Sequence, residues 1–223
     1  MIVIYLHGFA SSPQSAKASF FAERFAAAGI RYLCPDLNEP AFSTLTVSRM
    51  LQQLEKRISS LPPAEIVLMG SSLGGFVAVE AAARQVGEAR HPISRLILLA
   101  PALELEWDRW SEVGTGGIER WRKGGDVEIF HYARERPERL KFGFYEDAAR
   151  YHPATRRLDV PMLIFQGRQD ESVSPEIVER FWKRQGAATL HMLDDAHQLK
   201  NSLDFIWREI ARFLALRSQL SAL

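Results

Sequence analysis

Apolar and polar positions divide the chain into short apolar runs, separated by longer stretches in which apolar residues recur at helical spacing. Runs of this kind, rich in Val, Ile, Leu and aromatic residues, are typical of parallel strands that are covered on both faces. The last run alternates more than the others, which favours a position at a sheet edge. The runs lie at residues 2–6, 30–35, 66–69, 96–100, 162–165 and 189–193.

Helical stripes occupy the intervals between these runs. One stripe combines Val47, Met50, Leu51, Leu54 and Ile58. An earlier helix is predicted to have Ser12 as its N-cap and Pro13 in its first turn, and to stop at Gly29. The last helix is predicted to begin at about Ser202. Because strand and helix patterns alternate with short connections, the sequence predicts an α/β fold with about six mostly parallel strands flanked by helices.

The alternation breaks down between residues 103 and 159. This segment contains three of the five tryptophans, Trp107, Trp110 and Trp121, together with other aromatic residues and dense, nearly balanced charge. A connection of this length usually has secondary structure of its own and often a function. We therefore expect a mostly helical insert that covers one end of the sheet. The alternative is a second packing layer with no role in substrate choice.

Composition and charge narrow the class of protein. The 223 residues, insert included, are predicted to form a single domain with a substantial core. A formal net charge of +1 does not indicate a nucleic acid or an anionic membrane as the main partner. The single cysteine, Cys34, excludes an internal disulfide and fits a reducing compartment. Residues 1–6 resemble a strand rather than a signal peptide, and no apolar run is as long as a membrane helix, so a cytoplasmic location is expected.

The strongest chemical signal is Gly70-Ser71-Ser72-Leu73-Gly74, which directly follows the third apolar run. In the Gly-x-Ser-x-Gly pattern a serine lies on a strained turn between a strand and a helix, and its hydroxyl projects beyond the sheet. Glycine on both sides removes the side chains that would collide there. Only Ser72 has glycine at both two-residue offsets, and we therefore interpret it as a nucleophile. A merely tight turn is the alternative.

A serine hydroxyl needs a base at neutral pH, and two other loops at the same edge of the predicted sheet supply partners. Asp170 follows the fifth predicted strand and His197 follows the sixth. The order Ser, Asp, His is that of a large class of hydrolases. Neutral His197 would accept the proton of Ser72, and Asp170 would fix the imidazole tautomer and stabilise the imidazolium that forms.

Other residues compete for these roles. His191 lies within the last strand rather than after it, which favours a structural role, and Asp194 and Asp195 are interpreted as solvated loop acids. Glu104 and Glu106 follow the fourth strand, which is another position from which the acid can come. No partner pattern accompanies the remaining histidines, and no spacing of ligands indicates a metal site. These histidines are His7, His91, His131 and His152.

The oxyanion of an acyl-transfer intermediate needs two backbone N–H donors. Leu73, immediately after Ser72, is predicted to supply one of them. The loop after the first strand is predicted to supply the other through Phe9, because Gly8 allows a close approach. The alternative for this loop is a plain turn between strand and helix.

The same segments carry a resemblance to a known family. Residues 5–13 have the sequence YLHGFASSP, residues 15–18 are SAKA, and residues 70–75 are GSSLGG. With these motifs the chain resembles the small bacterial esterases of the YqiA-like branch of the α/β-hydrolase superfamily. Residues 167–173 and 195–197 also resemble the acid and histidine loops of the superfamily. The resemblance implies esterase or thioesterase activity on short to medium acyl groups, without a cofactor.

The predicted function is therefore hydrolysis of esters or thioesters of small to medium apolar acyl groups, through an acyl-enzyme on Ser72. Trp107 and Trp110 lie three positions apart in the insert and are predicted to line the acyl pocket, with the insert as a lid. The expected partner is a small-molecule ester or thioester, with no nucleic acid. Hydrolysis of an acyl-peptide or carbon–carbon bond on the same triad is one alternative. A non-catalytic binding protein on this fold is another.

Overall fold

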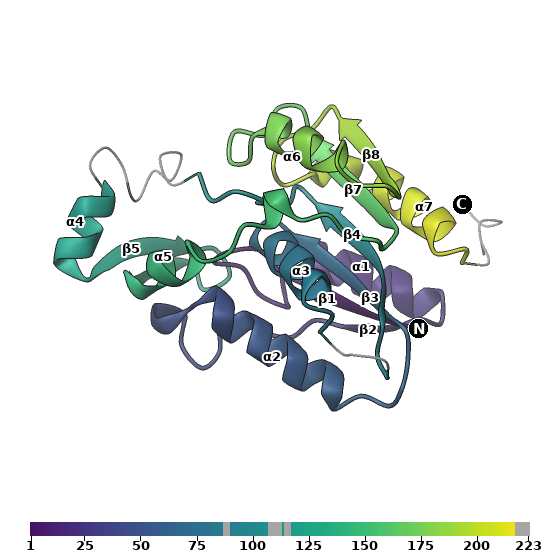
Figure 1. Cartoon of the computed structure of the whole chain (residues 1–223), viewed down its shortest axis with the longest axis horizontal. Helices are drawn as coiled ribbons and strands as arrows, with labels where there is room; N and C mark the ends of the chain where they lie inside the picture. Colours follow the sequence, from purple (N-terminus) through teal and green to yellow (C-terminus); the bar gives the residue numbers. More distant parts are fainter. Residues whose placement is uncertain (87–89, 107–112, 114–116, 217–223) are drawn as a thin grey trace.

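A single six-stranded sheet organises the molecule, as seen in the computed structural model (Figure 1), which describes residues 1–86, 90–106, 113 and 117–216. The strand order is β2-β1-β3-β4-β7-β8, and every neighbouring pair is parallel. The strands are β1 (Ile2–Leu6), β2 (Arg31–Leu33), β3 (Ile66–Ser71), β4 (Ile93–Leu99), β7 (Met162–Gly167) and β8 (Ala188–Leu193). Each predicted run coincides with one of these strands, and the predicted fold class is confirmed.

Burial explains why the apolar runs form these strands. All residues of β1, β3 and β7 are buried, as expected for strands covered on both faces. In β8, by contrast, no residue is fully buried, which agrees with its place at the edge of the sheet. All strands run in the same direction, so their carboxyl ends lie together at one end of the sheet. The loops that follow β1, β3, β7 and β8 are brought together at this carboxyl end.

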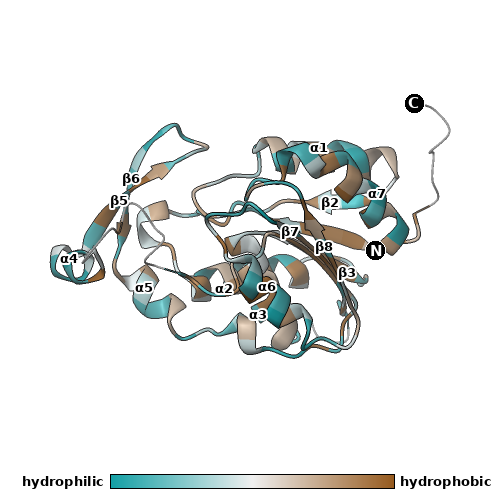
Figure 2. Cartoon of the chain, turned by 90° about the horizontal axis from the view of Figure 1, so that it is seen from above, coloured by the Kyte–Doolittle hydropathy of each residue, from teal (hydrophilic) through white to brown (hydrophobic). Residues whose placement is uncertain are grey.

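Helices cover both faces of the sheet (Figure 2), with α1 and α7 on one side and α2, α3 and α6 on the other. Within the described residues no helix combines the length and the apolar character needed to cross a membrane. The residues that α2 buries are those of the predicted stripe. The bounds are α1 (Ala16–Ala27), α2 (Val47–Ser59), α3 (Leu73–Ala83), α6 (Pro175–Trp182) and α7 (Leu203–Phe213).

The start of α1 differs from the prediction. Ser15, not Ser12, is the N-cap, and its hydroxyl oxygen accepts a hydrogen bond from Ala18 N at 3.3 Å. The Ser12 hydroxyl accepts from Gln14 N in the preceding turn instead. Either serine has a side chain suited to the cap, but residues 12–15 form a turn closed by a bond from Ser15 N to Ser12 O at 3.1 Å, and the helix begins after that turn. Gly29, with φ of +69°, follows the end of the helix as predicted.

The insert between β4 and β7 is less helical than expected. Its centre is an antiparallel hairpin of β5 (Asp126–His131) and β6 (Arg136–Lys141), which lies between α4 (Gly117–Gly124) and α5 (Gly143–Ala148). In β5 the side chains of Ile129 and His131 are buried while those of Glu128 and Phe130 are exposed. This two-residue period is that of a strand with one covered face.

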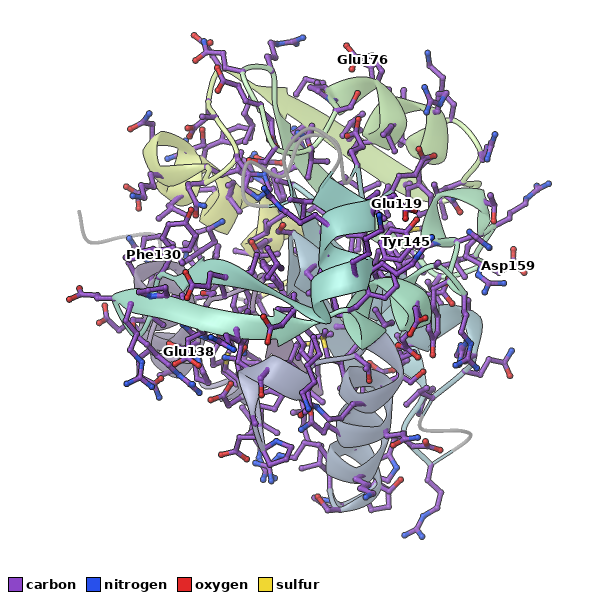
Figure 3. The ribbon with its side chains drawn as sticks, turned by 90° about the vertical axis from the view of Figure 1, so that its left-hand side faces the viewer. Glu119, Phe130, Glu138, Tyr145, Asp159 and Glu176 are labelled. Atoms are coloured by element: carbon purple, nitrogen blue, oxygen red, sulfur yellow. The ribbon has the colours of Figure 1, made fainter. Side chains whose placement is uncertain are left out.

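The insert has a small aromatic core of its own. Trp121 is buried, its indole N–H donates to Leu140 O at 3.0 Å, and its ring lies 5.6 Å from that of Phe142 and 6.3 Å from that of Tyr145. Figure 3, which faces the insert, shows Tyr145 beside α4 and Phe130 on the hairpin away from it. Most of these rings therefore stabilise the insert itself.

Two polar contacts fasten the insert to the core helices. The Asp147 carboxylate accepts hydrogen bonds from Ser48 N at 2.8 Å and from Ser48 Oγ at 2.5 Å, at the N-terminus of α2. After η3 (Pro153–Thr155), Arg156 donates two hydrogen bonds of 3.0 and 2.9 Å to Glu80 of α3, whose side chain is fully buried. The base of the insert is thereby held against α2 and α3.

Candidate active site

Ser72 occupies a strained turn between β3 and α3, with φ of 52° and ψ of −118°. Its two flanking glycines allow the helix to pass close to the strands. A Cβ atom on Gly70 would lie 2.3 Å from Gly74 O, and one on Gly74 would lie 1.9 Å from Leu6 O. Neither distance is compatible with a side chain, so the spacing of the two glycines follows from the packing of this turn.

The two adjacent serines differ in their surroundings. Ser71 is the last residue of β3, and its side chain is buried, with Oγ accepting a hydrogen bond from Lys17 Nζ at 3.1 Å. Ser72 is only partly buried and lies beyond the strand. The position beyond the strand and the strained backbone both distinguish Ser72 as the candidate nucleophile.

The predicted acid and base lie in hydrogen-bonding contact. Asp170 follows β7, His197 follows β8, and the distance from His197 Nδ1 to Asp170 Oδ2 is 2.9 Å. An ionised carboxylate can only accept, so Nδ1 carries the proton and donates, which leaves Nε2 of the neutral ring as an acceptor. The side chain of Asp170 is fully buried, whereas that of His197 is about one-fifth exposed, at 19%.

Several donors surround the Asp170 carboxylate. Oδ1 accepts from Ser172 N and Val173 N, each at 2.9 Å, and Oδ2 accepts from Gln166 Nε2 at 2.8 Å. Burial by itself raises the pKa of Asp170, but the hydrogen bond and charge of His197 and the other donors outweigh it and lower this pKa below its ordinary value. The carboxylate is therefore held in its charged form opposite the imidazole.

The loop that carries His197 is shaped by a second aspartate. Asp195 Oδ2 accepts from Asn201 N and from Ser202 Oγ, both at 2.9 Å, so this carboxylate organises the start of η4 (Lys200–Ser202). A Cβ on Gly167 would lie 2.4 Å from Asp195 O, which shows how closely this loop passes the end of β7. The prediction that Asp195 is a solvated loop acid is wrong, because its side chain is buried and its carboxylate accepts the bonds that shape this loop.

The other competing residues are engaged elsewhere. Glu106 accepts from Ser174 N at the start of α6, and Glu104 lies 3.9 Å from Arg180. His191, within β8, stacks on Phe165 with the ring centroids 5.3 Å apart. These contacts give the three competitors structural roles and leave Asp170 as the carboxylate that contacts His197.

His7, one of the histidines without a partner pattern in the sequence, shapes the predicted oxyanion loop. His7 Nε2 accepts from Leu37 N at 3.0 Å, so Nδ1 carries the proton and donates to Gly8 O at 2.9 Å. In a trans peptide the C=O and the following N–H point in opposite directions, and the Phe9 N–H therefore points away from the His7 ring. Gly8 lies beside the turn, since a Cβ there would be 3.5 Å from Ser72 Cβ.

The second predicted donor lies at a helix N-terminus. Leu73 is the first residue of α3, where backbone N–H groups lack an intrahelical acceptor and the helix dipole favours negative charge. The carbonyl oxygen of Ser72 accepts from Gly75 N, Phe76 N and Ala102 N, which fixes the peptide between Ser72 and Leu73. The position predicted for Leu73 as a donor is thus the first turn of a helix.

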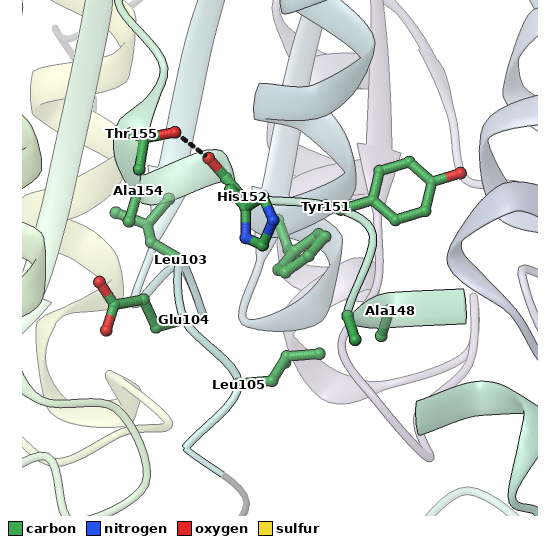
Figure 4. Close-up of a pocket in the computed structure, with 10 residues that line it drawn as sticks. Leu103, Glu104, Leu105, Ala148, Tyr151, His152, Ala154 and Thr155 are labelled. Carbon is green, nitrogen blue, oxygen red and sulfur yellow. Dashed lines mark hydrogen bonds between the residues drawn. The ribbon is translucent and has the colours of Figure 1, made fainter. Parts of the chain in front are cut away.

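A cavity of about 320 Å³ lies between the base of the insert and α3 (Figure 4). The cavity is connected to the candidate nucleophile turn through two residues of its wall. Phe76 donates its backbone N–H to Ser72 O, and Leu103 directly follows Ala102, whose N–H also donates to Ser72 O. Its volume is at the lower end of the range for small-molecule pockets. The lining residues are Phe76, Leu103, Glu104, Leu105, Ala148, Ala149, Tyr151, His152, Ala154 and Thr155.

Trp107 and Trp110, the residues predicted to line the acyl pocket, lie outside the described residues. A different aromatic residue of the insert reaches the candidate site. The ring of Phe144 stacks on that of Phe9 at 5.6 Å, and Phe9 also contacts the ring of Phe42 at 5.4 Å. The insert thus packs on the loop that carries one of the predicted oxyanion donors.

The contacts of three residues in this region were not predicted from the sequence. His7 directly precedes the predicted oxyanion glycine, and Gln166 lies four positions before Asp170, so their proximity to motifs was a usable signal. Their partners could not be predicted from the sequence, because the bond between His7 and Leu37 N joins residues 30 positions apart. Lys17 was part of the SAKA segment, but its contact with Ser71 joins positions 54 apart.

Comparisons with known proteins agree with this architecture. A family model described as an uncharacterised protein family, UPF0227, matches residues 2–215. Est1E from Butyrivibrio proteoclasticus superposes with a TM-score of 0.75 and 21% identity, covering 96% of this chain and 86% of Est1E. Alpha/beta hydrolase domain-containing protein 10 from mouse gives 0.75 and 17%, covering 96% and 89%. A monoacylglycerol lipase from Paleococcus ferrophilus superposes with a TM-score of 0.74 and 16% identity, covering 95% of this chain and 93% of the lipase.

These identities establish a shared fold and nothing finer. No curated protein matches the chain in a sequence comparison. Any conclusion on the reaction therefore depends on the residues at the carboxyl edge of the sheet.

Proposed function

We propose that this chain, which belongs to the uncharacterised protein family UPF0227 and shares its fold with solved α/β-hydrolases, is a serine hydrolase. It cleaves carboxylic esters or thioesters of small to medium apolar acyl groups. The observation that carries the proposal is the 2.9 Å contact between His197 Nδ1 and Asp170 Oδ2 at the edge where Ser72 occupies its strained turn. A histidine with this tautomer presents Nε2 as a general base.

The proposed reaction proceeds through an acyl-enzyme. Ser72 Oγ attacks the carbonyl carbon while His197 Nε2 takes the hydroxyl proton, and Asp170 stabilises the imidazolium. The negative charge that develops on the carbonyl oxygen is stabilised by the N–H groups of Leu73 and Phe9. The imidazolium then protonates the leaving alcohol or thiol as the bond to the carbonyl carbon breaks. Water, deprotonated by the same imidazole, releases the acid and restores Ser72.

The preference for apolar acyl groups is supported by the cavity at the base of the insert. Its wall combines Phe76, Leu103 and Leu105 with the small side chains of Ala148 and Ala154. Small residues leave space for a chain, and the larger ones offer apolar contact. In this proposal the insert acts as a lid, and each added methylene of the acyl chain raises kcat/KM about four-fold until the cavity is full.

The first experiment tests the nucleophile. The protein is treated with a fluorophosphonate and the labelled peptide is mapped, while turnover of acyl esters and thioesters of graded length is measured for wild type and Ser72→Ala. We expect label on Ser72 and a loss of turnover of several orders of magnitude in the variant. Label on Ser71, or on no serine, would contradict the proposal.

The second experiment tests the cavity. Ala149→Phe places a ring at the cavity from an exposed position, and Ala133→Phe, on the exposed hairpin tip, is the matched control. We expect the rise of kcat/KM with acyl length to stop at a shorter chain in Ala149→Phe and to be unchanged in the control. The same length profile in both variants would exclude this cavity as the acyl pocket.

A further inference from the structure

Lys17 lies against the candidate nucleophile turn, although the reaction above makes no use of it. It is the second residue of α1, on the face of the sheet opposite α3. Its ammonium group reaches across to the end of β3 and donates to Ser71 Oγ at 3.1 Å. The residue that receives this bond directly precedes Ser72 in the chain.

The Ser71 hydroxyl is a buried polar group that needs a partner, since Ser71 is only 7% exposed. Hydrogen bonds from a charged donor are about twice as strong as those between neutral groups, so the ammonium holds the end of β3 more firmly than a neutral donor would. Ser72 N, the next group along, donates to Leu99 O at 3.0 Å. Both bonds restrain the backbone immediately before the strained conformation of Ser72.

Several charged and titratable groups face the Lys17 ammonium. Asp170 and Asp195 attract it from the loops after β7 and β8, and Lys200 repels it. Tyr5 of β1 shares the Ser71 hydroxyl with it. Burial, only partly offset by the two carboxylates, lowers the pKa of Lys17 to about 8. The ammonium is therefore charged at neutral pH and is lost at mildly alkaline pH.

We propose that Lys17 is a positioning residue, whose ammonium group acts through Ser71 to hold Ser72 in the backbone conformation required for attack. This inference rests on the proposed function. A simpler arrangement, in which Lys17 is the base and Ser71 the nucleophile, conflicts with the burial of Ser71 and its regular place at the end of β3. The inference predicts an effect on the rate of reaction rather than on substrate binding, because neither residue faces the cavity.

The test is a double-mutant cycle with kinetic readouts. Lys17→Met and Ser71→Ala should each lower kcat by about ten-fold or more with little change in KM, as expected for loss of a hydrogen bond to a charged group. The double variant should be no slower than the slower single variant, because both substitutions remove the same contact. Lys17→Arg, which keeps a cation, should recover most of the rate.

The pH profile separates this role from a purely structural one. Activity of wild type should fall as the pH rises through about 8, because the protonated ammonium is the form that holds Ser71. That alkaline decline should be absent in Lys17→Met and present in Lys200→Met, the matched control with the neighbouring lysine removed. The thermal midpoint of Lys17→Met should be unchanged or higher, since burial of the ammonium opposes folding at neutral pH.

Each outcome decides the question. A Lys17→Met variant with full activity, an additive double variant, or an alkaline decline that persists in Lys17→Met would overturn the inference. A fall in kcat that only parallels a fall in the thermal midpoint would reduce Lys17 to a structural role. If Ser72 fails to take the fluorophosphonate label, the proposed function itself is wrong. If Ser72 is labelled and Lys17→Met is fully active, only the role of Lys17 is wrong.

Discussion

The strained backbone of Ser72 makes a prediction about stability that is independent of any substrate. Ser72 has φ of 52° and ψ of −118°, a region that glycine adopts readily and other residues do not. Replacing it with glycine should relieve the strain, whereas replacing it with alanine should retain it. Both variants lack the hydroxyl, so both should be inactive. The difference between their free energies of unfolding therefore reports the backbone conformation alone.

The size of the effect follows from two opposing contributions. A non-glycine residue in a sparsely populated region costs about 1–3 kcal/mol. Glycine loses about 0.5–1 kcal/mol more backbone entropy on folding than alanine does. Ser72→Gly should therefore be more stable than Ser72→Ala by about 1 kcal/mol, and by up to about 2.5 kcal/mol where the strain is largest. For a chain of this size, a difference of about 1 kcal/mol raises the thermal midpoint by about 2–4 °C.

The assay is thermal unfolding followed by circular dichroism, with both variants at the same pH and protein concentration. Gln52 supplies the control, because it is an exposed residue in the middle of α2 with ordinary helical geometry. There the order should reverse, with Gln52→Gly about 1 kcal/mol less stable than Gln52→Ala. A Ser72→Gly variant no more stable than Ser72→Ala would show that the turn stores no strain.

Three further predictions concern the base, the ion pair of the insert, and its buried histidine. In an ester-hydrolysis assay His197→Gln should abolish most activity, because it removes the base that accepts the serine proton, whereas His191→Gln should keep most of it. The opposite ranking of the two variants would show that His191 is the base. In urea unfolding Arg156→Met should cost more than Glu80→Gln, by about 1–3 kcal/mol, because it leaves the fully buried Glu80 carboxylate with the longer contact to Arg84 at 3.6 Å, while Arg156 itself is 39% exposed. Equal losses would refute this. Burial, and to a lesser degree Arg134, lower the pKa of His131, against weaker opposing effects of Glu138 and Asp36. The unfolded chain therefore binds a proton first as the pH falls below about 6.5, and the folded state loses stability there. The difference in thermal midpoint between pH 7.5 and pH 5 should shrink in His131→Phe, and an unchanged difference would contradict this.

The parts of the fold that the sequence predicts well are those in which local pattern and tertiary environment agree. The runs that become β1, β3 and β7 are apolar at nearly every position because both faces of each strand are covered. The candidate site could be assembled from the same pattern, since Ser72, Asp170 and His197 each follow a strand closely. Parallel topology then brings them to one edge.

The hairpin of the insert escaped prediction because its sequence does not look like a strand pair. β6 has the sequence RPERLK, in which only Leu140 is buried, and it is stabilised by pairing with β5 rather than by apolar content. Exposed aromatics added to the ambiguity, with Tyr132 at the hairpin tip 69% exposed. Long-range polar contacts such as Arg156 with Glu80 have no local signature at all.

The insert also shows what aromatic content can and cannot indicate. The rings of Trp121, Phe142 and Tyr145 pack on one another, and that packing is what an isolated segment needs in order to fold on the edge of a sheet. The cavity lies instead where the base of the insert meets α3, and its wall mixes the small side chains of Ala148 and Ala154 with larger ones such as Phe76 and Tyr151. A ligand needs unfilled space between two layers, and large rings remove that space unless something else holds them apart. Aromatic residues in an insert therefore indicate first how the segment is held together, and a pocket is better sought along the seam where its small residues meet the core.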